Sequence, residues 1–253
     1  MGGLDSSLNI NLGYQKQWSA IQGAPKTQSI TADYGIGKKV GVGINISDDV
    51  AGLLKRTRVM GSYAYHLPVG ETQHLNFGIS LGFMNQRLET ENVNGEQDDV
   101  NIGRYNQRKT YFDGDFGLAY TTQDITIQAV VPNLKAFLKK DEYNAIDRSL
   151  FFSSAGYKIY FEESLKGISL EPKVCFRGVR GLASIVDFGS NVTFLNNALN
   201  FMLMYHTSQS TTFGAGVNYK KLCTIQGVYT TETSALRGYV NGNFEINLKL
   251  NLL

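Results

Sequence analysis

The ten residues before the C-terminal Leu253 alternate strictly between apolar and polar side chains. The apolar set is Phe244, Ile246, Leu248, Leu250 and Leu252, and the polar set is Asn243, Glu245, Asn247, Lys249 and Asn251. A β-strand sends successive side chains to opposite faces, so this segment has one apolar face and one polar face. At this length, the pattern predicts a strand of a transmembrane barrel, with lipid on one side and an aqueous lumen on the other.

The same alternation recurs along the whole chain. Clear copies run through 8–14, 40–46, 75–83 and 199–205, and weaker ones through 26–35, 56–66, 110–121, 124–131, 150–161, 167–177, 183–194, 211–219 and 222–230. With the terminal segment they make about fourteen strands, an even number, as in single-chain bacterial outer-membrane barrels. We therefore predict an all-β fold: one antiparallel, up-and-down transmembrane β-barrel domain of about fourteen strands spanning residues 1–253.

The connections between these segments differ in length. Those after even-numbered strands are tight: Gly37-Lys38, Pro68–Thr72, Thr121–Asp124, Glu162–Lys166, Asn196-Asn197 and Lys220-Lys221. Those after odd-numbered strands are often longer: Trp18–Pro25, Ser47–Lys55, Glu89–Lys109, Pro132–Ser149 and Thr230–Asn241, with Gly178–Gly181 and Thr207–Ser210 as short exceptions. Outer-membrane barrels have short periplasmic turns and longer extracellular loops. We expect the short-turn rim and both termini to be periplasmic.

Composition excludes several other classes. The net charge is +2, from 24 basic and 22 acidic residues, so no global field attracts nucleic acid or anionic lipid. No run approaches the roughly 18 apolar residues of a membrane-spanning helix. No signal peptide is visible after Met1. Cys175 and Cys223 match no metal spacing, and we expect two unpaired thiols.

A large soluble β-protein is the alternative architecture. Its apolar strand faces would need a partner sheet, and its strands average about five to six residues, shorter than those expected here. Pro172 falls within a predicted strand, where proline is poorly tolerated. We expect a bulge at Pro172 or a later start of that strand.

Catalysis finds little support in the sequence. The three histidines, His66, His74 and His206, fall on different predicted strands, and no nucleophile motif accompanies them. No cluster of His, Cys or Asp has metal-ligand spacing. We expect no enzyme activity, no cofactor and no metal site.

Charged residues of both signs occupy the polar phases of the strands. The set is Arg58, Asp113, Asp115, Lys158, Glu171, Lys173, Arg177, Asp187, Glu245 and Lys249. Mixed signs at this density predict salt-bridged networks across a narrow or plugged lumen rather than a selectivity ring of one sign.

Three segments resemble the PorP/SprF family of outer-membrane proteins from the type IX secretion and gliding machinery of Bacteroidetes-type bacteria. They are Tyr14–Gln28 (YQKQWSAIQGAPKTQ), Ser62–Gly70 (SYAYHLPVG) and Val131–Leu134 (VPNL). The first is the most specific, and the similarity extends over essentially the whole chain. The final Leu253 departs from the pattern, because barrel proteins commonly end in an aromatic residue.

The resemblance implies a non-enzymatic secretion component of the bacterial outer membrane and cell surface. Such a barrel helps to export or anchor proteins with a type IX C-terminal signal domain. Its expected partners are those proteins, a periplasmic ring, an outer-membrane translocon and membrane lipid, with no nucleic acid. The candidate partner-binding residues are Gln17, Trp18, Gly23, Ala24, Pro25, Thr27, Gln28, Pro132 and Asn133. A diffusion porin or small-solute transporter is the alternative function, since barrels perform both tasks.

Overall fold

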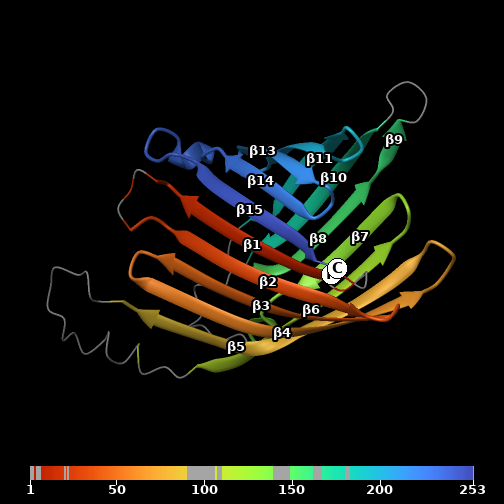
Figure 1. The fold of residues 1–253 in the computed structure, drawn as a ribbon. Helices are drawn as coiled ribbons and strands as arrows, with labels where there is room; N and C mark the ends of the chain where they lie inside the picture. Colours follow the sequence, from red (N-terminus) through yellow and green to blue (C-terminus); the bar gives the residue numbers. More distant parts are fainter. Residues whose placement is uncertain are drawn as a thin grey trace, which may run out of the picture.

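The chain forms a β-barrel, shown in Figure 1. This computed structural model describes residues 3, 7–19, 21, 23–89, 106, 110–138, 149–161, 167–179 and 183–252. The elements are β1 (Leu8–Gln17), β2 (Lys26–Ile36), β3 (Val40–Ala51), β4 (Leu54–Pro68), β5 (His74–Leu88), β6 (Tyr111–Thr121), β7 (Ile125–Val131), α2 (Leu134–Leu138), β8 (Ser149–Tyr157), β9 (Ile159–Phe161), β10 (Ile168–Val179), β11 (Ile185–Phe194), β12 (Leu199–His206), β13 (Ser210–Tyr219), β14 (Cys223–Thr230), the 3-10 helix η1 (Ser234–Leu236) and β15 (Asn243–Leu252).

The sheet closes on itself. β15 pairs with β1 in an antiparallel register that runs from Leu8↔Leu252 to Gln17↔Asn243. β8 and β9 both pair with β10, so they are two parts of one wall strand. The fifteen strand segments therefore make a closed barrel of fourteen strands among the described residues. This confirms the predicted up-and-down barrel, which closes only when its last strand pairs with its first.

The expected bulge at Pro172 is not found. β10 begins at Ile168, so Pro172 lies within the strand and not before it. The β10 register is continuous across the site, with Leu170↔Ile159 on one side of Pro172 and Lys173↔Gly156 on the other. The irregularity lies in the partner strand, which is interrupted between β8 and β9 at Lys158, whose N–H donates to the Asp124 carbonyl at 2.7 Å. Because Pro172 has no N–H to give, this break on the neighbouring strand accommodates it.

The two faces of the wall have opposite chemistry. Outward positions carry large exposed apolar side chains, such as Ile44 (46% exposed) and Leu203 (58%). Inward positions carry buried polar side chains, among them Asn9, Asn76, Asp113 and Asp187. Apolar side chains outside and polar side chains inside reverse the arrangement of a soluble protein, and they suit a wall between lipid and an aqueous lumen. A closed barrel also pairs every strand, so no unpaired backbone edge faces the bilayer.

The barrel has two different rims. Five described turns lie at one rim, which we call the turn rim: 37–39, 69–73, 122–124, 195–198 and 220–222. The described ends of the chain lie at the same rim, because Leu8 pairs with both Leu252 and Tyr34 (right of Figure 1). The connection 162–166 and most of 89–109 lie outside the described residues. We call the opposite end the loop rim.

The prediction of one long loop at the loop rim is wrong. Ser47–Lys55 is not a loop, because β3 continues to Ala51 and β4 begins at Leu54. Ion pairs extend the hairpin on both faces: Lys55 pairs with Asp48 at 3.5 Å, and Arg56 pairs with Asp49 at 3.2 Å. Gly52, at a φ of +61°, supplies the left-handed turn residue.

Both cysteines are free thiols, as expected. Within the described part of the chain, no helix has the length and apolar character of a membrane-spanning helix.

Candidate functional site in the lumen and at the loop rim

β7 is the shortest of the fourteen wall strands. This strand has seven residues, whereas a membrane-spanning β-strand needs about 9–11. Its last pair is Val131 with Phe116, so the stretch of β6 from Tyr111 to Asp115 has no β7 partner. Pro132 ends the ladder because it has no N–H, and the chain turns into α2, which packs against β6. We call this place, where α2 takes the position of a longer β7, the seam.

Two carboxylates on β6 hold the seam together. The N–H of Asn133 donates to Asp115 Oδ1, and the N–H of Lys135 donates to Asp113 Oδ1, both at 2.9 Å. Asp115 also accepts a charge-assisted hydrogen bond from Arg58 Nη2 at 2.6 Å. The backbone at the start of α2 is thereby held by the side chains of two lumen-facing acids rather than by a neighbouring strand.

The candidate residues of the VPNL segment therefore have a structural position. Asn133 is buried at 9% exposure, with a positive φ of 53° that lets the chain leave the ladder. Lys135 places its ammonium group 4.2 Å from the centre of the Tyr111 ring. No partner chain is present, so a partner-binding role for Pro132 and Asn133 stays a prediction.

A second polar network crosses five strands, β10 to β14, near the loop rim. Arg177 on β10 donates to Asp187 on β11 from Nε at 3.0 Å and from Nη2 at 2.8 Å. His206 Nδ1 on β12 lies 2.6 Å from the same carboxylate, which can only accept, so the ring donates. The network continues from His206 Nε2 to the Thr212 hydroxyl at 2.7 Å and then to Thr230 at 2.7 Å.

Sequence reasoning named Arg177 and Asp187 but missed His206. The available signal was the alternation, because His206 falls in the inward phase of its strand. The register Asp187↔His206 then makes them direct neighbours.

A third network, also missed, lies towards the turn rim. His66 Nδ1 lies 2.7 Å from Asn76 Oδ1, and Asn76 donates to the Thr121 hydroxyl at 3.1 Å. His66 and Asn76 are 3% and 1% exposed.

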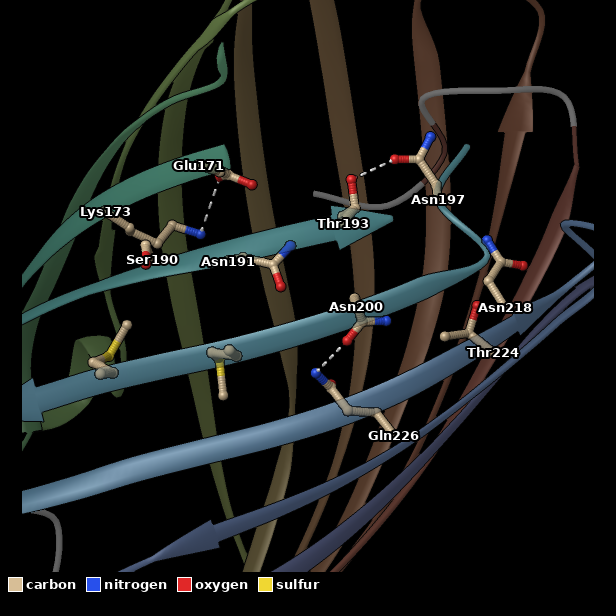
Figure 2. A pocket seen from close by; sticks show the side chains of 12 residues that line it. Glu171, Lys173, Ser190, Asn191, Thr193, Asn197, Asn200, Asn218, Thr224 and Gln226 are labelled. Atoms are coloured by element: carbon tan, nitrogen blue, oxygen red, sulfur yellow. Dashed lines mark hydrogen bonds and ion pairs between the residues drawn. The ribbon is translucent and has the colours of Figure 1, made fainter. Parts of the chain in front are cut away.

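The opposite side of the lumen contains a polar recess of about 390 Å³, shown in Figure 2. Its lining comes from β10 to β14 and is Glu171, Lys173, Ser190, Asn191, Thr193, Asn197, Asn200, Met202, Met204, Asn218, Thr224 and Gln226. The charged pair in it is loose, with Lys173 Nζ 3.8 Å from Glu171 Oε1, and Gln226 donates to Asn200 at 3.3 Å. Amides dominate this lining, so it suits water or a neutral polar group better than a single ion.

The two charges of the closing strand do not pair with each other. Glu245 accepts a hydrogen bond from Asn247 at 2.7 Å. Lys249 lies opposite Asn11 and Thr224 and has no ion pair within the part of the chain that the structure describes. The predicted lumen charges are thus brought together as three ion pairs, Arg58–Asp115, Lys173–Glu171 and Arg177–Asp187, rather than as one ring.

The first loop is braced on both sides at the loop rim. The Trp18 N–H donates to the Gly242 carbonyl at 3.2 Å, and the Gly52 N–H donates to the Gly23 carbonyl at 3.0 Å. The N–H of Gln17 donates to the Pro25 carbonyl at 2.9 Å and closes the base of the loop. The candidate residues Gln17, Trp18, Gly23, Ala24 and Pro25 therefore lie together at this rim.

The other two candidates of that segment point to opposite faces of β2. Thr27 faces the lumen and donates to Asp49 at 2.8 Å, whereas Gln28 is exposed on the outer face. Within the described ranges, no group of three or more His, Cys, Asp or Glu side chains has metal-binding geometry.

Solved structures with a similar fold are outer-membrane proteins. The outer membrane protein Omp33 of Acinetobacter baumannii aligns over 99% of this chain and 100% of its own, with a TM-score of 0.55 and 7% identity. A mutant of Rh. blastica porin aligns over 97% of this chain and 99% of its own, with a TM-score of 0.41 and 8% identity. At such low identity, Omp33 shows the fold alone. No curated protein matches the sequence.

The sequence also matches a protein family over nearly its full length. Residues 1–250 match the family described as type IX secretion system membrane protein PorP/SprF. The closed fourteen-strand barrel with an apolar outer face agrees with an outer-membrane location. The chain belongs to the PorP/SprF family and is an outer-membrane β-barrel component of type IX secretion.

Proposed function

We propose that this chain helps to export, or to anchor at the cell surface, proteins that carry a type IX C-terminal signal domain. The observation that carries the proposal is the family match over residues 1–250. The role is non-enzymatic and relies on contacts with cargo, a periplasmic ring and an outer-membrane translocon. In this proposal the loop rim faces the cell exterior, and the turn rim with both chain ends faces the periplasm.

The seam is the place at which we propose that cargo docks. The stretch of β6 from Tyr111 to Asp115 lacks a neighbouring β7 strand, so its backbone forms an edge that α2 covers. An extended segment of a β-sandwich signal domain can pair with such an edge, which is the common β-augmentation mode of peptide recognition. The hydrogen bonds between the start of α2 and β6 join backbone N–H groups to carboxylate side chains, so an incoming strand would replace few backbone–backbone bonds.

Site-specific photo-crosslinking in cells tests this placement. A photoreactive residue at Leu138, which is 76% exposed at the end of α2, should capture a protein with a type IX signal domain, identified by mass spectrometry. The matched position is Leu222, 53% exposed in the turn between β13 and β14 at the other rim, and it should not capture such proteins. Equal capture at both positions, or none at Leu138 while export proceeds, would contradict the docking site.

Deletion of the gene tests the function itself. We expect proteins with type IX signal domains to disappear from the medium and cell surface and to accumulate in the periplasm, with recovery when the intact gene is restored. Unchanged export and unchanged surface proteins in the deletion strain would refute the proposal.

A diffusion porin or solute transporter remains the second candidate, and the polar recess of about 390 Å³ favours it. Planar-bilayer conductance distinguishes the two functions.

A further inference from the structure

Two lysines face each other on the outer surface of the barrel. Lys16 on β1 and Lys26 on β2 are direct register partners, and both are exposed. They share the outward phase with Tyr14 and Ile30, which are 38% and 42% exposed. Both ammonium groups therefore lie on the side of the wall that contacts lipid.

The protein leaves the charge of this pair uncompensated. Lys16 lies beside Phe244 on β15, and Lys26 lies beside Val50 on β3. The nearest carboxylate on the same face of β3, that of Asp48, is occupied by Lys55 at 3.5 Å and by the Thr57 hydroxyl. Neither Lys16 nor Lys26 has an ion pair among the residues that the structure describes. Like charges directly opposite each other destabilise a sheet, so this arrangement favours binding of an anion.

The pair borders a recess of about 470 Å³ on the outer face beneath the first loop. The recess is lined by Tyr14, Lys16, Ser19, Ile21, Gly23, Ala24, Lys26, Val50 and Gly52. Gly23 and Gly52 keep its upper edge free of side chains, and their backbone hydrogen bond at 3.0 Å fixes that edge. The lysines and Ser19 form a polar part, whereas Tyr14 and Val50 form an apolar part.

The recess lies at the depth of a lipid headgroup. It sits at the ends of β1 and β2 next to Trp18, and tryptophan prefers the interface between membrane and water. Charged and apolar surface side by side in one recess match a lipid with an anionic headgroup and acyl chains. A protein or nucleic acid would have to displace lipid to reach this face.

We propose that Lys16 and Lys26 bind the phosphate of a lipid headgroup, and that the ligand is a phosphorylated glycolipid of the lipid A type in the outer leaflet. The choice of leaflet rests on the proposed orientation, with the loop rim outside. Lysine binds phosphate as a point charge, so two lysines on neighbouring strands bind one phosphate from two sides. This site is independent of cargo docking at the seam.

Lipid titration of the purified full chain tests the proposal. Trp18 is the only tryptophan and lies two residues from Lys16, so its fluorescence reports occupancy of the recess. The barrel in zwitterionic detergent micelles is titrated with lipid A, dephosphorylated lipid A, phosphatidylglycerol and inorganic phosphate. We expect the tightest binding for lipid A and weaker binding at high salt.

The Lys16→Gln/Lys26→Gln variant should bind lipid A about 25-fold more weakly, because each lysine near a membrane surface contributes about fivefold. The matched control is Lys38→Gln/Lys39→Gln, an exposed pair at the turn rim with the same change in net charge, and its affinity should not change. The two single variants, each expected to lose about fivefold, serve if the double variant does not form the heat-modifiable folded barrel.

Three results would overturn the inference. Wild-type affinity of the folded Lys16→Gln/Lys26→Gln variant would refute the role of the lysines. Equal binding of dephosphorylated lipid A would refute phosphate recognition. Equal or tighter binding of phosphatidylglycerol or inorganic phosphate would refute the glycolipid ligand. None of these results depends on whether deletion of the gene affects export.

Discussion

At the scale of single residues, Asp187 joins three strands through one carboxylate. It is 3% exposed and accepts hydrogen bonds from Arg177 on β10 and His206 on β12. We expect Asp187→Asn to lower the free energy of unfolding by about 2 kcal/mol, because the amide presents a donor to Arg177 and removes the charge that it pairs with. Urea unfolding in micelles, followed by Trp18 fluorescence, measures this change.

The matched control for this prediction is Asp124→Asn, at the β6–β7 turn. Its carboxylate has no hydrogen bond or ion pair within the described residues, so its unfolding midpoint should stay near that of the wild type. Equal midpoints for Asp187→Asn and the wild type would show that the network across β10–β12 adds nothing to stability.

At the scale of strands, two glycines allow neighbouring strands to approach closely. A Cβ on Gly82 of β5 would collide with the Val59 carbonyl and lie 2.8 Å from Met60 Cα. A Cβ on Gly189 of β11 would meet Leu203 and Met204 in the same way. We expect Gly82→Val to prevent formation of the barrel, because the obstacles are backbone atoms that cannot move without breaking the β4–β5 ladder.

Gly61→Ala on β4 is the control, because a Cβ there meets only the Leu81 carbonyl at 3.9 Å. The fraction of protein that runs as the compact, heat-modifiable form on a gel measures folding. Normal folding of Gly82→Val would show that the close approach of β4 and β5 is not required.

At the scale of the whole barrel, the two halves of the lumen differ in packing. The inward side chains of Met60, Met84 and Asn76 on β4 and β5 are each 1% exposed, whereas the β10–β14 side contains the polar recess. Because these buried side chains narrow the lumen along β4 and β5, we expect no large, steady conductance from the purified barrel in planar bilayers. Large, long-lived openings in every preparation would favour the diffusion porin instead.

Much of this architecture was predictable from the sequence alone. Alternation of residues such as Phe244 and Glu245 is a local property, imposed because each wall residue contacts either lipid or lumen. It predicted the strands, their inward and outward phases, and closure between the first and last strands. The same phases placed Asp115 and Asp187 on the inner face. Three motifs indicated the resemblance to the PorP/SprF family, and the family match over residues 1–250 confirms it.

Only the tertiary structure decided which side chains meet. The Asp187–His206 contact and the opposed lysines at 16 and 26 depend on cross-strand register, which turns and barrel closure set together. The end of β7 at Val131 agrees with the predicted segment 124–131, but the stretch of β6 that β7 leaves unpaired was not predictable, because it depends on the register between the two strands. The β3–β4 hairpin was missed because its charged residues resemble a loop until their partners lie opposite them. Alternation thus specifies the wall, while register, a long-range property, specifies the sites upon it.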